Sequence, residues 1–174
     1  MFNAGKPSGE GTEISRDGSR YVGMHFNGKR HGQGNLTWPD KCHYSGEFID
    51  SKACGQGTFI YPSGRRYVGE FVNSIPHGQG VEIKPNGLQH CGLWDNGKPH
   101  GQFIIIAPNG KRAEGPYVDS KRHGLFTDYQ PNGTRIERTY LAGKKSELYV
   151  EIDAQGVRRK KRSATNAEVT GTSL

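Results

Sequence analysis

The chain of 174 residues carries a net charge of +7 and contains only 32% hydrophobic residues beside 26 glycines. This composition argues against a globule with a large interior, and no apolar run approaches the roughly 18 residues that a membrane-spanning helix needs. The 10% aromatic content argues against a disordered chain, so a thin and repetitive fold is expected.

Residues 1–20 read as the end of a repeat, because Gly5, Gly9 and Gly11 are in register with the copies that follow. The first residues have no apolar core, so no signal peptide is expected. Without an export signal, the three cysteines are expected to be reduced thiols in the cytosol. They are Cys42, Cys54 and Cys91.

Six copies of a 23-residue repeat follow without insertions and cover residues 21–158. Their first residues are Tyr21, Tyr44, Tyr67, His90, Ala113 and Ile136. The sixth copy departs from the others, with Arg138 at the third position and Glu147 at the twelfth. A degenerate terminal copy is typical of the cap that a repeat array needs.

Glycine and aromatic residues recur at fixed positions of the repeat. The third position holds Gly23, Gly46, Gly69, Gly92 and Gly115, and the fifth holds Phe48, Phe71, Trp94, Tyr117 and Tyr140. Pro-x-Gly turns are predicted at 62–64, 85–87, 108–110 and 131–133, with a variant at 39–41. Short alternating runs flank these turns, so each copy is predicted to be a β-hairpin. Hairpins stacked edge to edge predict an all-β fold, an elongated single antiparallel sheet of tandem 23-residue repeats.

The fifth-position aromatics are expected to form the packed face of the sheet, supported by isoleucines on the second strands. These isoleucines are Ile60, Ile83, Ile106 and Ile152. The alternative is a row of rings that stacks nucleic-acid bases. The fold has little other apolar material to hold it together, so a core is favoured and nucleic acid is not expected as a partner.

The opposite, outer face is expected to carry an apolar patch in the first two copies, formed by Leu36, Trp38, Phe59 and Tyr61. The third copy places Glu82 and Lys84 at the same positions. An apolar outer surface suggests a partner or self-association surface. The alternative is local stacking of Trp38 on Tyr61.

A second difference separates the two halves of the array. The early copies carry Gly-x-Gly before the second strand, whereas later copies replace the second glycine by Phe103, Phe126 and Tyr149. This extra aromatic bulk is expected to change the twist of the ribbon or its loop edge.

No motif of catalysis or nucleotide binding occurs in the sequence. Four histidines share one repeat position: His31, His77, His100 and His123. Neighbours in such a column lie at least roughly 10 Å apart, too far to share a zinc ion at about 2 Å from each nitrogen. No metal, cofactor or enzymatic activity is therefore expected.

Residues 159–174 are expected to form a basic, disordered tail. Five consecutive cations lie where the last repeat meets this tail: Arg158, Arg159, Lys160, Lys161 and Arg162. Acidic phospholipid, an acidic protein partner and a nuclear-import receptor all suit such a cluster. Phosphorylation of the adjacent Ser163 is expected to weaken this binding.

The pattern Y-x-G-E-F followed by Gly-x-Gly and Pro-x-Gly, repeated over residues 21 to about 135, resembles the MORN (membrane occupation and recognition nexus) repeat family. The resemblance implies a non-catalytic scaffold or adaptor that binds protein partners or forms a homodimer, which the resemblance suggests is antiparallel. It also implies a cytoplasmic location at a membrane or cytoskeletal structure. The alternative function is an electrostatic module that binds acidic phospholipid through the basic cluster.

Overall fold

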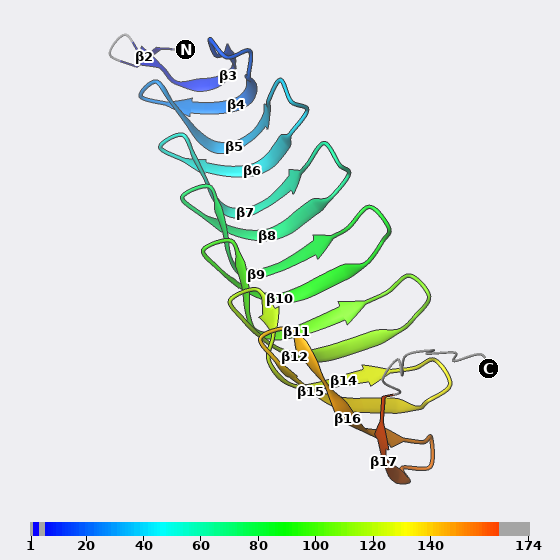
Figure 1. Ribbon diagram of the computed structural model, residues 1–174. Coiled ribbons are helices and arrows are strands. Elements are labelled where there is room, and N and C mark those ends of the chain that lie inside the picture. Colours follow the sequence, from blue (N-terminus) through cyan, green and yellow to red (C-terminus); the bar gives the residue numbers. More distant parts are fainter. Residues whose placement is uncertain (1, 4–5, 164–174) are drawn as a thin grey trace, which may run out of the picture.

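A computed structural model describes residues 2–3 and 6–163, and all regular structure in these residues is β-strand. Fifteen strands form one antiparallel sheet in which consecutive strands lie side by side, and β1 pairs with β2 apart from it. Figure 1 shows this sheet as a long twisted array with the N-terminal strands at one end and β17 at the other. The predicted all-β architecture of stacked hairpins is confirmed.

The strands before the fourth copy are β1 (Phe2–Asn3), β2 (Lys6–Pro7), β3 (Gly9–Ile14), β4 (Arg20–Phe26), β5 (Lys29–Thr37), β6 (His43–Ile49), β7 (Lys52–Ile60), β8 (Arg66–Val72) and β9 (Ile75–Ile83). The later strands are β10 (Gln89–Asp95), β11 (Lys98–Ile106), β12 (Arg112–Val118), β13 (Lys121–Arg122), β14 (Gly124–Tyr129), β15 (Arg135–Leu141), β16 (Lys144–Ile152) and β17 (Arg158–Arg162).

Two kinds of turn connect the strands. The predicted Pro-x-Gly turns lie at their expected residues, on the right of Figure 1, and Gly64 N–H donates to Tyr61 O at 2.9 Å. At the other edge, two-residue loops such as Asn73-Ser74 have positive φ at both residues (52° and 69°), as a type I′ hairpin requires. The twelfth-position glycines follow these loops with φ between 59° and 83°, a backbone that other residues rarely adopt. Turn chemistry therefore fixes both ends of every hairpin.

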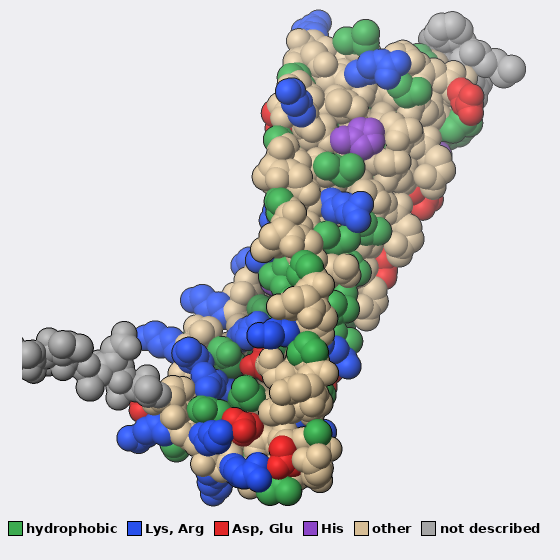
Figure 2. Space-filling model, turned by 90° about the vertical axis from the view of Figure 1, so that its right-hand side faces the viewer, with side chains coloured by type: hydrophobic (Ala, Val, Ile, Leu, Met, Phe, Trp, Pro, Cys, Tyr) green, Lys and Arg blue, Asp and Glu red, His purple; other side chains and the backbone are tan. Residues whose placement is uncertain are grey.

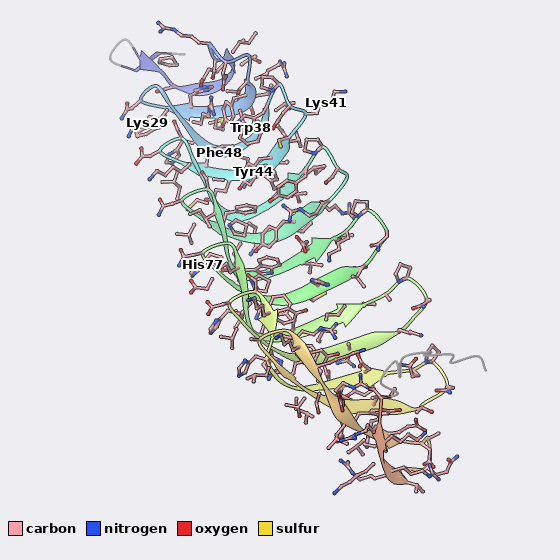
Figure 3. The ribbon with its side chains drawn as sticks, in the orientation of Figure 1. Lys29, Trp38, Lys41, Tyr44, Phe48 and His77 are labelled. Carbon is pink, nitrogen blue, oxygen red and sulfur yellow. The ribbon has the colours of Figure 1, made fainter. Side chains whose placement is uncertain are left out.

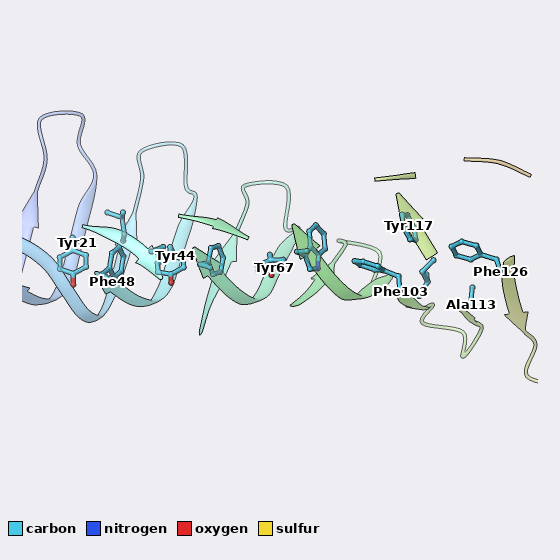
Figure 4. Packing of buried hydrophobic residues seen from close by; sticks show 13 residues of the cluster. Tyr21, Tyr44, Phe48, Tyr67, Phe103, Ala113, Tyr117 and Phe126 are labelled. Atoms are coloured by element: carbon cyan, nitrogen blue, oxygen red, sulfur yellow. The ribbon is translucent and has the colours of Figure 1, made fainter. Parts of the chain in front are cut away.

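Tyrosine rings cover glycines in the first three copies. The Tyr67 ring lies over Gly69 on its own strand and Gly80 on the next, so a Cβ at Gly80 would overlap it. Its hydroxyl donates to Glu70 O at 3.2 Å, just where a bulge interrupts the pairing of β8 with β9. Figure 4 shows the rings as one row along the array, each meeting the next mostly edge to face, as Tyr67 does with Phe71 at 5.1 Å.

In the fourth and fifth copies the ring that covers the glycine comes from the second strand and not from the first. In the fifth copy Ala113 replaces the tyrosine, and Phe126 on the next strand fills the space over Gly115. In the fourth copy Phe103 does the same over Gly92. These phenylalanines stand in for tyrosine rings, so the extra bulk expected from the sequence is not added in these two copies.

The two faces differ from the sequence-based assignment in one respect. The aromatic stripe is buried as predicted, Phe48 and Phe71 being only 2% and 3% exposed. However, Phe59 lies opposite Tyr67 in the ladder and Leu36 opposite Tyr44, so both belong to the aromatic face. The outer-face placement of Leu36, Trp38, Phe59 and Tyr61 is therefore wrong.

The same register places the isoleucines that were expected to support the core on the other face of the sheet. Ile60 and Ile106 lie on the opposite face and are 37% and 38% exposed, so they do not support the aromatic core. Ile152 is buried, but outside the main aromatic cluster.

The basic cluster is also ordered, which corrects the expected disorder at its first residues. Arg158–Arg162 form β17, which pairs with β16, and Ser163 N–H donates to Glu147 O at 2.8 Å. Residues 164–174 of the predicted tail lie outside the described residues.

Candidate interaction pocket

An aromatic row follows the ends of the second strands in the first two copies. Trp38 contacts Phe59 with ring centroids 5.6 Å apart, and Phe59 contacts Tyr61 at 4.6 Å. All three are partly exposed, in contrast to the buried rings beside them. The two copies are therefore joined by stacking of Trp38 on Phe59, and not by the expected stacking of Trp38 on Tyr61.

Arg65 closes one end of this row. Its guanidinium carbon lies 3.7 Å from the Tyr61 ring centroid, and its Nη1 forms an ion pair with Glu82 Oε1 at 2.9 Å. Glu82 also lies near His90, where burial is the main cause that lowers the pKa of the imidazole. The apolar surface thus ends at Arg65 of the second copy and Glu82 of the third.

A small cavity of about 180 Å³ opens beside the aromatic row. It is lined by Leu36, Trp38, Tyr44, Phe48, Ser51, Ala53, Phe59, Phe71 and Ser74. The rings of Trp38, Tyr44 and Phe48 lie together near the N-terminal end of the array (Figure 3). Small-molecule pockets commonly measure roughly 300–1,000 Å³, so this cavity suits one inserted side chain better than a whole small molecule.

Ala53 keeps the cavity open, and the sequence analysis missed it. The equivalent tenth position of the first copy holds Arg30, whose guanidinium lies over the Tyr21 ring at 5.3 Å. In the fifth copy Arg122 lies over Phe126 at 4.7 Å. Ala53 is too short to cover Tyr44 in this way, and its N–H donates to Ser74 Oγ at 3.0 Å. Ala53 is the smallest residue at the tenth position in the six copies, which a comparison along the repeat would have shown.

Four of the five cations of the basic cluster form ion pairs with acidic residues of the sixth copy. The ion pairs are Arg158–Glu137 at 2.6 Å, Arg159–Asp153 at 2.8 Å, Lys161–Glu151 at 2.7 Å and Arg162–Glu147 at 3.7 Å. The hydrogen bond from Arg159 is the main cause that lowers the pKa of Asp153. Lys160 alone has no ion pair within residues 6–163. Figure 2 shows these positive and negative side chains gathered at the C-terminal end of the molecule.

Other candidate chemistry is sparse in the described part of the chain. No group of three or more His, Cys, Asp or Glu side chains there could hold a metal ion. The histidine column is spread along the array, one histidine in each of four copies near the start of the second strand, where His77 Nδ1 lies 3.8 Å from Asp95 Oδ1. Cys42, Cys54 and Cys91 are free thiols. No helix long and apolar enough to cross a membrane occurs among the described residues.

Comparison with protein-family models finds the MORN repeat in five consecutive segments: residues 1–20, 21–43, 44–65, 67–89 and 90–102. The chain belongs to the MORN repeat family. The matched MORN segments end just before Phe103, the first residue at which a phenylalanine replaces a repeat glycine. No curated protein matches the chain.

Two solved structures share the single-sheet architecture of this MORN array. One is the TCP domain of SAS-4 (dCPAP) of Drosophila melanogaster, in complex with a proline-rich motif of Ana2 (dSTIL). It is 13% identical, with a TM-score of 0.53, and the match covers 94% of this chain and 98% of that one. The other is a mutant of the TCP10 domain of Danio rerio CPAP, which is 19% identical with a TM-score of 0.50. The match covers 90% of this chain and 80% of that one. At these identities the likeness concerns the fold alone.

Proposed function

We propose that the protein is a MORN-repeat scaffold that binds a protein partner through the pocket beside Trp38, Phe59 and Tyr61. The observation that carries this proposal is the uncovered cavity at Ala53, where the first and fifth copies have an arginine over an aromatic ring. Elsewhere on the aromatic face most rings are buried against one another. An apolar cavity of this size, flanked by partly exposed rings, is suited to a side chain of an extended peptide.

The peptide class proposed is proline-rich. Proline-rich segments dock in grooves lined by aromatic rings and lose little entropy on binding, because their extended helix is preformed. The Drosophila neighbour, which has a related fold, forms a complex with a proline-rich motif, which makes this class the first to test.

Trp38 fluorescence provides the measurement. A Trp94→Phe background leaves Trp38 as the single tryptophan, and phenylalanine already occupies this repeat position at Phe48 and Phe71. Titration with a soluble polyproline peptide should give a saturable change in Trp38 emission. Ala53→Arg should abolish this change, because arginine fills the same position over Tyr21 in the first copy.

Two further variants complete the test. Tyr61→Ala should weaken binding by about tenfold, equivalent to roughly 1.4 kcal/mol. Ile106→Ala, on the opposite face, should leave the affinity unchanged. Equal peptide affinity in Ala53→Arg, Tyr61→Ala and the parent would rule out this pocket as the binding site.

Binding to acidic phospholipid through β17 is the second candidate function, and Lys160 and the 70%-exposed Arg162 favour it. Each cation near an anionic surface contributes about 1 kcal/mol, but four of the five already face a carboxylate. We therefore expect only weak, salt-sensitive binding to phosphatidylserine vesicles in a sedimentation assay. Lys160→Gln with Arg162→Gln should remove it, whereas Arg20→Gln with Arg66→Gln, a matched pair elsewhere on the sheet, should not. The reverse pattern would place the lipid contact in the repeats.

A further inference from the structure

The two edges of the sheet are the two halves of one hairpin. Within the described residues, β3 pairs only with β4 and β17 pairs only with β16. The β3 sequence GEGTEI matches GQGVEI at the end of β9, so β3 is the second strand of a repeat. The cluster RRKKR of β17 occupies the same repeat positions as RYVGE of β8, so β17 corresponds to the first strand of a repeat. Each edge therefore lacks the strand type that the other provides.

The hydrogen-bonding groups on the two free edges have matching phase. Asp153 N–H donates to Val157 O and Ser163 N–H to Glu147 O. The backbone N–H and C=O groups of the odd-numbered residues of β17 are therefore directed toward β16. The N–H and C=O groups of Arg158, Lys160 and Arg162 consequently point outward. In the same way Ser15 N–H donates to Ser19 O, so the odd-numbered residues of β3 bond to β4. The backbone N–H and C=O groups of Thr12 and Ile14 therefore point outward from β3.

The register inside a normal hairpin brings these outward groups together. In the β8–β9 hairpin Arg66 lies opposite Ile83 and Val68 opposite Val81. The same register between β17 and β3 places Arg158 opposite Ile14 and Lys160 opposite Thr12. All of these residues present their free backbone groups, so an unbroken ladder can form.

Side-chain charge favours this pairing over the alternatives. The same register places Arg159 opposite Glu13 and directs Arg162 toward Glu10, while Gly11 leaves room for Lys161. Like charges directly opposite each other destabilise a sheet. Two copies of β17 would bring five cations against five, and two copies of β3 would bring glutamates together. Charge on an edge strand is also a common means of preventing indiscriminate pairing.

We propose that β17 of one molecule adds to β3 of a second copy, completing a hairpin and continuing the sheet from one molecule into the next. The contact is heterologous, and each added molecule leaves one β3 edge and one β17 edge free at the two ends of the continued sheet, so it builds linear head-to-tail oligomers. This inference goes beyond the pocket and does not require any ligand to bind there.

Sedimentation velocity over a concentration series tests the proposal on the full chain. The weight-average mass should rise continuously above the 19.2 kDa of one chain, without a plateau at the dimer. Oligomer growth should weaken as salt is raised, because the facing charges of Glu10 and Arg162 are exposed. Glu10→Lys, which alters no ion pair of the described residues, should reduce growth at low salt.

Edge-blocking prolines give the sharper test. Lys160→Pro removes an outward N–H from β17 and Thr12→Pro removes one from β3, each at a position where an edge strand tolerates proline. Lys160→Pro blocks β17 and leaves β3 free, whereas Thr12→Pro blocks β3 and leaves β17 free. Because pairing needs one free edge of each kind, each variant alone should remain monomeric. An equimolar mixture should form a heterodimer and stop there. Lys160→Ala, which keeps the N–H, should still form chains.

Circular dichroism and thermal unfolding close to those of the parent show that the proline variants are folded. The proposal is overturned if the parent stays monomeric at about 200 µM, a concentration at which even a weak association of Kd about 100 µM would be evident. It is equally overturned if the mixed proline variants behave as the separate ones do. The peptide titration at Ala53 is unaffected by either result, so failure of the assembly and failure of the pocket are distinguishable.

Discussion

Gly80→Phe should destabilise the protein strongly, and adding Tyr67→Ala should restore much of the loss. A side chain at Gly80 would overlap the Tyr67 ring, which is 2% exposed and cannot move aside without opening the core. Overpacking of this kind costs about 1–3 kcal/mol or more, and removal of the Tyr67 ring alone should cost about 3–5 kcal/mol. The double variant reproduces the arrangement of the fifth copy, in which Ala113 and Phe126 occupy these two positions.

Urea unfolding of the parent, both single variants and the double variant measures this exchange as a double-mutant cycle. The loss of unfolding free energy in the double variant should be about 2–3 kcal/mol smaller than the sum of the losses in the two single variants. A difference of this size is in the range found for residues that share one packing site. Val81→Phe, the next residue but on the opposite face, is the size control and should have little effect. Strict additivity would mean that the two rings do not occupy equivalent space.

The hairpins and their turns could be predicted because each depends on local residues. Pro-x-Gly sets one turn, a two-residue loop sets the other, and the 23-residue period carries both along the chain. The assignment of faces failed because it depends on which residues lie opposite each other. Tyr61 N–H donates to Arg65 O, and from this closing pair the ladder runs back to place Phe59 opposite Tyr67. Counting outward from the Pro-x-Gly turn would have given the correct face.

The basic cluster was predicted to be disordered because composition was considered without the repeat phase. RRKKR continues the period of the first strands, and Glu137, Glu151 and Asp153 of the sixth copy supply the opposing charges. The pocket was partly predictable: its aromatic residues were identified, but Ala53 becomes meaningful only when the arginines at the same position are seen to cover rings.

Alkaline pH should destabilise the array through its buried tyrosines. Burial is the main cause that raises the pKa of Tyr44 and of Tyr67 to about 12, against 10.0 for an ordinary tyrosine. The folded state therefore favours the neutral phenol. Its contribution is complete below pH 10 and is lost as pH rises from 10 through 12, at about 1.4 kcal/mol per pH unit for each tyrosine. The loss reaches up to about 2.7 kcal/mol for each, so the two together remove a large part of the stability of a small domain.

Phenylalanine variants separate this effect from the titration of other groups. Tyr44→Phe with Tyr67→Phe loses two hydrogen bonds, to Glu47 O at 3.1 Å and to Glu70 O at 3.2 Å, and should start about 1–3 kcal/mol less stable at pH 8. All other titratable groups are common to the two proteins. The urea midpoint of the parent should consequently fall more steeply between pH 10 and 12, and the two curves should converge or cross. Parallel curves would mean that both phenols ionise in the folded protein as they do in the unfolded chain, and that the rings over the glycines are open to water.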